Sequence, residues 1–358
     1  MTDVEVKMGT GHSGRATNAD GGVLGRRGAG MLACIILLVL ISFPLRADNA
    51  LGAITATTEA KSGAFYGQAQ EYVYDQSISK NYKNSQLDWP FEPMIFTGAE
   101  LSLDFQHGIF ASLEVRQGFS GKAGTMTDSD FLNGNGVLTL FSQSDSYAER
   151  ANFLDLKAGW DFMKDGSLTV GAFGAFSYMD LKWTARDGYL QYPPGSYNYG
   201  SYPTWSSSFT QEPLYGIGII YETAYLGGAV GVRSRYTMKG GFVFVASLAF
   251  TPLLYCFTED DHVLRQIAFF STLSGGLMIE PRVSVEYSPV PRAKIKLDIG
   301  YRYAWNLIGD IIEVSTGTSD FSGNFPYVAG PDSTTTGTND SGASLWALDA
   351  GISLSISL

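Results

Sequence analysis

The sequence has few cysteines and histidines, the residues that stabilise small disulfide-linked or metal-binding domains. Among its 358 residues there are only two cysteines, Cys34 and Cys256, and three histidines. Two cysteines exclude a disulfide framework and a zinc site built on cysteine. Charged residues make up only 16%, and the net charge of −11 argues against nucleic acid as a partner.

What the sequence does contain is glycine and aromatic residues. There are 42 Gly, 20 Tyr and 22 Phe, and 45% of all residues are apolar. This is not the polar, highly charged composition of a disordered chain. Glycine and aromatic residues with few charges are typical of a β-rich protein that meets a membrane interface.

The N-terminal region predicts export. Arg26 and Arg27 precede an apolar run over residues 31–45, and a small residue, Ala47, follows it. This order is typical of a secretory signal peptide, and the alternative is an N-terminal membrane anchor. The run is shorter than the roughly 20 residues that a spanning helix needs, which favours the signal peptide. We therefore assign residues 1–47 to a leader and residues 48–358 to the folded domain.

The folded domain shows apolar and polar residues in alternation. The pattern is clearest over residues 294–303 and 346–358, where every second side chain is apolar. Such alternation predicts strands with one apolar face, either in an outer-membrane barrel or in a soluble β-sandwich. The export signal and the strand count favour an all-β, ten-stranded antiparallel transmembrane β-barrel. We predict strands at 64–75, 93–105, 108–119, 147–162, 166–183, 209–235, 241–257, 263–287, 292–309 and 343–358.

The connections between these strands alternate in length. Short turns are predicted at 106–108, 164–166, 238–240 and 288–291, and longer connections at 76–92, 120–146, 184–208 and 310–342. In such barrels the short turns are periplasmic and the long loops face outside. Segments 120–146 and 258–262 are then outer loops, and we expect them to carry the active site. The segment 209–235 is long for one strand, and its Gly-Gly pair at 227–228 indicates a bulge or an extra turn.

Two short motifs on these outer loops could support hydrolysis. Asp260 and His262 form an Asp-x-His motif, in which the carboxylate fixes the imidazole tautomer and raises its basicity. Asp128 and Asp130 could hold a water molecule opposite this pair. Each motif has a plainer interpretation, because Asp-x-Asp is often a solvated pair or a cation site and Asp-x-His is common by chance. His107, in a predicted periplasmic turn, is interpreted as a polar turn residue.

These motifs belong to a wider similarity. Residues 67–74 (GQAQEYVY), 85–89 (SQLDW), 126–131 (MTDSDF), 184–186 (TAR) and 260–262 (DDH) follow one another in the order found in the omptin family of outer-membrane endoproteases. The sequence resembles that family in scattered blocks over residues 67–305. The resemblance implies an endopeptidase of the cell outer membrane, with polypeptide substrates and an active site that faces outside.

The resemblance also implies residue roles. Asp260 would orient His262, His262 would activate water, and Asp128 with Asp130 would position that water; no metal, other cofactor or acyl-enzyme is implied. Glu71 would bind a basic residue before the cleaved bond. The family's second acid in that pocket is replaced by Thr258, and Glu259 would point to the other strand face, so the preference for basic residues is expected to be weaker.

The resemblance bears on lipid and on the alternatives as well. Family members bind lipopolysaccharide through basic and aromatic residues, but Asp180 stands here where the family has Arg, so we expect no strict dependence on this lipid. The barrel is expected to act as a monomer.

The alternative is a non-catalytic outer-membrane barrel: a structural protein, a narrow porin or an adhesin. Cys256 is interpreted as a packing residue. Tryptophans near predicted strand ends are interpreted as interface anchors: Trp89, Trp183, Trp205, Trp305 and Trp346.

Overall fold

The computed structural model describes residues 54–357, with gaps at 79–81, 195–201 and 316–338. The predicted leader, residues 1–47, lies outside the described residues, so the signal peptide remains a prediction. No helix in the described part of the chain is long and apolar enough to cross a membrane. The described chain is almost entirely strand, with one 3-10 turn, Gln106–Gly108. The strands are β1 (Thr55–Asp75), β2 (Lys83–Asp104), β3 (Ile109–Gly118), β4 (Gly121–Asp130), β5 (Leu140–Asp165), β6 (Leu168–Gln191), β7 (Glu212–Thr237), β8 (Phe242–His262), β9 (Ile267–Val290), β10 (Ala293–Ser315) and β11 (Asn339–Ser357).

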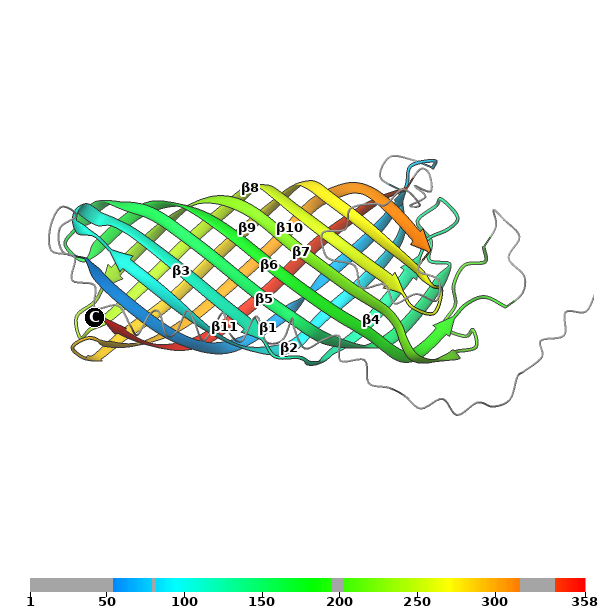
Figure 1. The fold of residues 1–358 in the computed structure, drawn as a ribbon, viewed down its shortest axis with the longest axis horizontal. Coiled ribbons are helices and arrows are strands. Elements are labelled where there is room, and N and C mark those ends of the chain that lie inside the picture. The colour runs from blue at the N-terminus through cyan, green and yellow to red at the C-terminus, as the bar shows by residue number, and fades with distance from the viewer. Residues whose placement is uncertain (1–53, 79–81, 195–201, 316–338, 358) are drawn as a thin grey trace, which may run out of the picture. The chain divides into compact units, whose positions relative to one another are not determined.

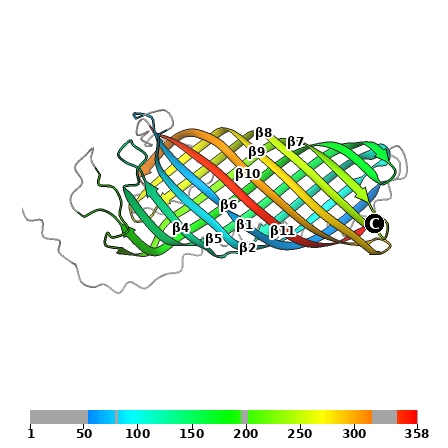
Figure 2. The same cartoon turned by 180° about the vertical axis from the view of Figure 1, so that it is seen from behind.

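These strands close into one antiparallel ring with ten positions. Each strand from β5 to β11 pairs with the next one along the chain, and β1 closes the ring by pairing with both β11 and β2. β3 and β4 share one position, since both lie between β2 and β5. Figures 1 and 2 show the strands crossing the barrel obliquely on its two sides. The predicted ten-stranded antiparallel barrel is therefore confirmed.

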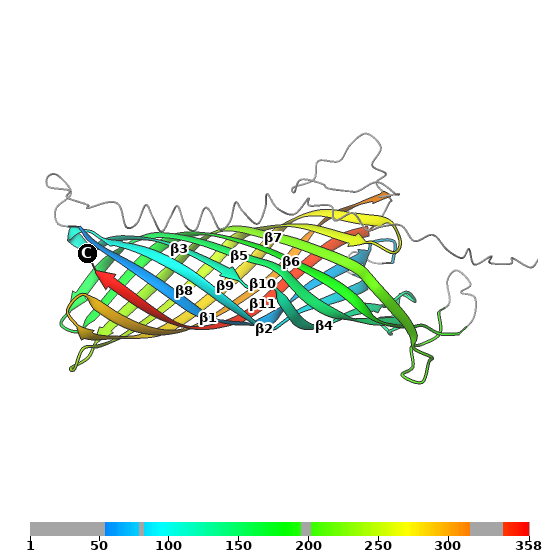
Figure 3. The same cartoon turned by 60° about the horizontal axis from the view of Figure 1, so that its bottom comes forward.

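The two ends of the barrel differ in their connections. At one end, called here the turn end, the strands are joined by four short connections, at residues 105–108, 166–167, 238–241 and 291–292. Each overlaps a turn that the sequence predicts, at 106–108, 164–166, 238–240 and 288–291. Thr57 pairs with Ser357 at this end, so the first and last strands begin and finish there, as the C label in Figure 3 shows. The opposite end, called here the loop end, holds the longer connections.

The strands at the loop end extend further than the sequence predicts. The segment 120–146 is not one loop: β4 continues to Asp130, and β5 begins at Leu140. The segment 258–262 is likewise not a loop, because β8 continues to His262 and the turn to β9 follows it. Similar extensions shorten the predicted loops 76–92 and 184–208. Beyond the bilayer both strand faces meet water or a polar cavity, so the apolar alternation that marks a membrane strand is lost there.

A band of exposed apolar side chains encircles the middle and the turn-end half of the barrel. On β8, for example, Phe244, Leu248, Phe250, Leu253 and Tyr255 are exposed, whereas the residues after Tyr255 no longer follow this pattern. A strand of about 10 residues spans a bilayer, but these strands reach 26 residues. The loop-end halves of the strands therefore rise well beyond the membrane. The Gly-Gly pair of β7 marks a bulge, since the register to β8 shifts between Gly228 and Val230.

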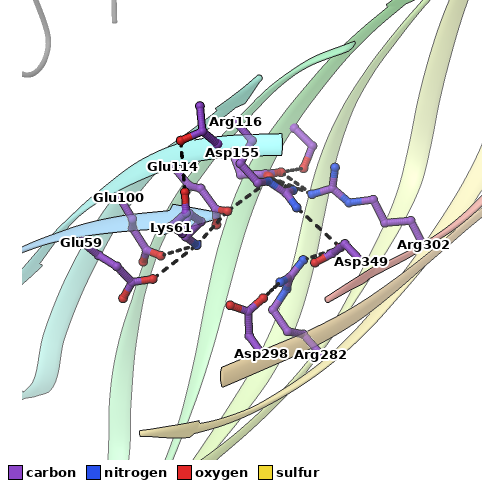
Figure 4. A network of polar contacts seen from close by, with 12 residues as sticks. Glu59, Lys61, Glu100, Glu114, Arg116, Asp155, Arg282, Asp298, Arg302 and Asp349 are labelled. Carbon is purple, nitrogen blue, oxygen red and sulfur yellow. Dashed lines mark hydrogen bonds and ion pairs between the residues drawn. The ribbon is translucent and has the colours of Figure 1, made fainter. Parts of the chain in front are cut away.

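The interior of the barrel is filled by side chains at mid-height. Phe65, Phe96 and Phe153 pack around the guanidinium of Arg116, whose carbon lies 5.1 to 5.8 Å from their ring centroids. Beside them lies a layer of alternating charges, called here the charged layer and shown in Figure 4. It consists of Lys61, Glu114, Arg116, Asp155, Arg282, Asp298, Arg302 and Asp349.

The charged layer is tightly connected. Arg302 donates to Asp155 at 2.7 Å, and Arg116 donates to the same carboxylate at 3.1 Å. Arg282 joins Asp298, at 2.7 Å, to Asp349, at 2.9 Å. In a narrow porin, one of the alternatives left open by the sequence, such inward charges would line a channel. They form a packed network, which argues against the porin alternative.

Candidate active site

The four predicted catalytic residues line one cavity at the loop end of the barrel. Asp128 and Asp130 alternate along β4, and Asp260 and His262 alternate along β8, so each pair points to the interior face of its strand. The cavity has a volume of about 480 Å³, within the usual range of ligand pockets. The expectation that outer loops carry these residues is wrong, because all four lie on strands.

The imidazole of His262 is held by Asp260. Nε2 of His262 lies 2.7 Å from Oδ2 of Asp260, and the ring meets Phe269 edge-on at a centroid distance of 5.4 Å. A carboxylate only accepts hydrogen bonds, so in the neutral imidazole Nε2 carries the proton and Nδ1 has the lone pair. Burial alone would lower the pKa of His262, but Asp260 outweighs burial and raises this pKa above its usual value of 6.5.

The two aspartates of β4, which face this pair, both have raised pKa values. Burial, and then the charge of Asp130, raise the pKa of Asp128 from 3.8 to about 8. Burial also raises the pKa of Asp130. The hydroxyl of Ser85 on β2 donates weakly to Oδ1 of Asp128, at 3.4 Å. At neutral pH Asp128 therefore retains a proton that it can donate.

Glu71 lies beneath the four residues, on β1. The register places it opposite Leu87 of β2, and Leu87 opposite Asp128, so three neighbouring strands bring Glu71 to the same cavity. Glu71 is 2% exposed, and its Oε2 atom has no hydrogen-bond partner among the described residues. Burial, and then Asp260 and Asp128, raise its pKa well above 4.5. Within the described structure this buried acid has no counter-charge, as expected of a pocket for a cationic side chain.

The neighbours of Asp260 on β8 match the sequence expectation. Thr258 points inward and is 2% exposed, so the position of the second pocket acid is neutral. Glu259 points outward, where the strand register places it opposite Glu222 of β7. It cannot replace an acid at position 258. Cys256 is fully buried beside Thr223, at 3.0 Å, which supports its interpretation as a packing residue.

Aromatic side chains pack in the barrel interior next to the cavity, beyond Leu87 of its lining. Trp89 and Tyr221 stack at a centroid distance of 5.3 Å, and Phe91 and Trp183 pack next to them. Trp89 and Trp183 are fully buried, so their interpretation as interface anchors is wrong. The reason is strand extension: both positions lie beyond the membrane, inside the raised half of the barrel. The ring nitrogen of Trp89 and the hydroxyl of Tyr221 lack hydrogen-bond partners in the described structure.

The sequence analysis missed two charged residues that line the cavity, Glu313 of β10 and Arg265. Arg265 lies in the turn between β8 and β9, and its Nη1 is 3.4 Å from Nδ1 of His262. It is the one Lys or Arg among the described residues that line the cavity. A single exposed arginine in a turn carries no pattern, and only its place three residues after His262 could have drawn attention to it.

The outward face near Asp180 is balanced in charge. Asp180 binds Arg150 at 2.8 Å, and Arg150 also binds Glu222 at 2.7 Å, with Lys182 paired to the same glutamate. The cations on this part of the barrel wall are thus already paired with acids of the chain. Within the described residues no group of three or more His, Cys, Asp or Glu side chains is arranged to hold a metal ion.

Fold and site together define a class: a β-barrel protease of the outer membrane, with its acids and imidazole raised above the bilayer. A family model described as the omptin family matches residues 53–336, and the chain belongs to that family. The predicted outer-membrane endopeptidase, which acts on polypeptides, is confirmed at the level of the family.

Two known proteins are similar to the chain. The plasminogen activator of Yersinia pestis is 23% identical over 249 residues, which cover 68% of this chain and 75% of that protein. The crystal structure of the outer membrane protease OmpT from Escherichia coli superposes with a TM-score of 0.72 at 18% identity. That match covers 85% of this chain and 97% of OmpT, and it shows that the two proteins share their fold.

Proposed function

We propose that the barrel hydrolyses peptide bonds with a water molecule activated by His262. The observation that supports this most directly is the common cavity: the Asp260–His262 pair and the Asp128–Asp130 pair line it from β8 and β4. Asp128 is also close enough to His262 for each charge to shift the pKa of the other. An imidazole with a fixed tautomer and a facing acid are the two partners that hydrolysis needs.

In the proposed reaction, Nδ1 of His262 takes a proton from water while the water oxygen attacks the peptide carbonyl carbon. The imidazolium that forms is stabilised by Asp260. The protonated carboxyl of Asp128 donates to the carbonyl oxygen as negative charge develops there, and Asp130 helps to hold the water. His262 then returns its proton to the leaving amine, and the carbon–nitrogen bond breaks. No covalent intermediate with the protein is formed.

The first subsite of this proposal is the pocket of Glu71. A guanidinium or ammonium group placed there would supply the missing partner of Oε2 and would ionise the acid. Part of the binding energy is used for that ionisation, because the pKa of Glu71 is raised well above 4.5. Since Thr258 adds no second carboxylate, the preference for a basic residue before the cleaved bond should be modest.

Two further properties belong to the proposal. Lipopolysaccharide is not strictly required, because Arg150 is already paired with Asp180 and Glu222 on the outer wall. The barrel acts as a monomer, because one chain closes the ring and supplies both catalytic pairs and Glu71.

The test is cleavage of a peptide library by the refolded protein in detergent, with and without lipopolysaccharide. His262→Ala should lower kcat/KM by about 10²- to 10⁴-fold, the usual contribution of a general base. His107→Asn is the matched control, since His107 lies in a turn at the opposite end and Asn tolerates its φ of 65°. Equal activity of the His262→Ala variant and the control would refute the mechanism.

A further inference from the structure

Arg265 is placed where a substrate chain must pass. It lines the same cavity as the four catalytic candidates, at the rim formed by the turn between β8 and β9. The side chain is exposed, and its flanking residue Leu264 also lines the cavity. Any peptide that reaches His262 therefore passes within reach of a guanidinium group.

This guanidinium has no ion-paired acid in the described structure. The one hydrogen bond of the guanidinium to a described residue is the 3.4 Å approach of Nη1 to Nδ1 of His262. Asp130 is near enough for the two charges to interact, but it forms no ion pair with Arg265 in the described structure. The other arginines at the loop end are paired: Arg150 with Asp180 and Arg186 with Glu149. Arg265 thus keeps its hydrogen-bond donors available for a ligand, and its planar group suits a carboxylate.

The contact with His262 also has a consequence. Because Asp260 holds Nε2, Nδ1 is the nitrogen that can accept a proton, and Arg265 donates toward that atom. While the guanidinium stays there, it competes with water for the lone pair. A carboxylate bound by Arg265 would draw the guanidinium away and leave Nδ1 available.

We propose that Arg265 is a specificity-determining residue that binds an acidic side chain of the substrate near the cleaved bond. This inference rests on the proposed protease function and adds a second requirement to it. The preferred substrate carries a basic residue, held by Glu71, and a Glu or Asp within a few residues of it, held by Arg265. When Arg265 binds that acid, its guanidinium leaves Nδ1 of His262.

The test uses pairs of peptides that differ only in Glu or Gln at one position, scanned along both sides of a single Arg. The wild-type protein should cleave the Glu peptide about three- to tenfold faster at one position, measured as kcat/KM, which is the range of a partly exposed ion pair. The ratio should fall as salt is added. Peptides with a free or an amidated C-terminus separate a side-chain carboxylate from a terminal one.

Variants of Arg265 then decide the assignment. Arg265→Gln should bring the Glu-to-Gln ratio to about 1, and Arg265→Glu should invert it. The matched control is Lys122→Gln, which removes one exposed positive charge outside the cavity and should retain the wild-type ratio. A wild-type ratio near 1 at every position, or a ratio that survives in Arg265→Gln, would overturn the proposal.

A binding measurement separates this proposal from the protease mechanism. In an Asp128→Asn background, which should be inactive, the Glu peptide should bind about three- to tenfold more tightly than the Gln peptide, the same ion-pair range, and Arg265→Gln should remove the difference. If no peptide is hydrolysed but this difference is present, the mechanism fails and the role of Arg265 stands. If peptides are hydrolysed without any such difference, the role of Arg265 fails alone.

Discussion

Replacing Asp128 by asparagine should stabilise the barrel at neutral and alkaline pH while it removes activity. Burial and Asp130 raise the pKa of Asp128 from 3.8 to about 8 in the folded protein. Between these two values the folded chain binds a proton that the unfolded chain has lost. By linkage, this carboxyl makes the free energy of unfolding fall as the pH rises from about 4 to about 8. An asparagine does not titrate, so this fall disappears in the variant.

The size of the effect follows from the shift. Each pKa unit corresponds to about 1.4 kcal/mol. An isolated Asp128 would therefore lower the free energy of unfolding by about 4 kcal/mol between about pH 5 and pH 8. Asp130 lies in the same cavity and takes part of the change, which leaves about 2 kcal/mol for the substitution. The amide of the Asp128→Asn variant cannot transfer a proton to the reacting oxygen, and activity should drop by about 10²-fold or more.

The assay is urea unfolding in detergent micelles at several pH values, followed by tryptophan fluorescence, with Trp89 and Trp183 as buried reporters. The expected result is a difference in unfolding free energy between the variant and the wild type that grows with pH. The control is Asp165→Asn, at the exposed end of β5 on the other side of the barrel, for which the difference should stay constant. A constant difference for Asp128→Asn as well would refute the electrostatic reasoning.

The remaining predictions concern specificity and topology. Glu71→Gln should lower kcat/KM for Arg peptides by about tenfold relative to Gln peptides, because a charge-assisted bond is lost; an unchanged cleavage profile would show that the pocket is elsewhere. Thr258→Asp should increase the preference for Arg, measured on the same peptide pairs, and a preference that stays the same or declines would count against a shared pocket. A thiol label at Asn135→Cys should react on intact cells and one at Lys164→Cys should not, with Cys256 buried in both; the reverse pattern would reject an outward-facing site.

The membrane-spanning part of the fold could be predicted from the sequence because lipid imposes a two-residue period. Inward side chains such as Asp298 are polar and outward ones such as Leu297 are apolar. This alternation in the sequence predicts the strand. Above the bilayer that contrast is lost. At Thr127 and Asp128, for example, both strand faces are polar, and the sequence resembles a loop although β4 continues through both residues.

The candidate site could be predicted only in part. Asp260 and His262, two residues apart, share a strand face by simple geometry. That Glu71 meets Asp128 depends on the register of three strands through Leu87, which no local pattern specifies. Arg265 could not be predicted at all, because its importance comes from a contact with His262 and not from its neighbours in the sequence.

The filled barrel interior also determines which side of the envelope can reach the enzyme. A second cavity, lined by Glu59, Arg235 and Lys294 among others, lies toward the turn end of the barrel. Along β2, Trp89, Phe91 and Phe96 separate it from the loop-end cavity, and the charged layer with Asp155 and Arg302 lies across the same passage. A polypeptide on the turn-end side has no path to His262. With the proposed site at the loop end, substrates enter and fragments leave by the same mouth, and periplasmic proteins on the turn-end side stay out of reach of the protease.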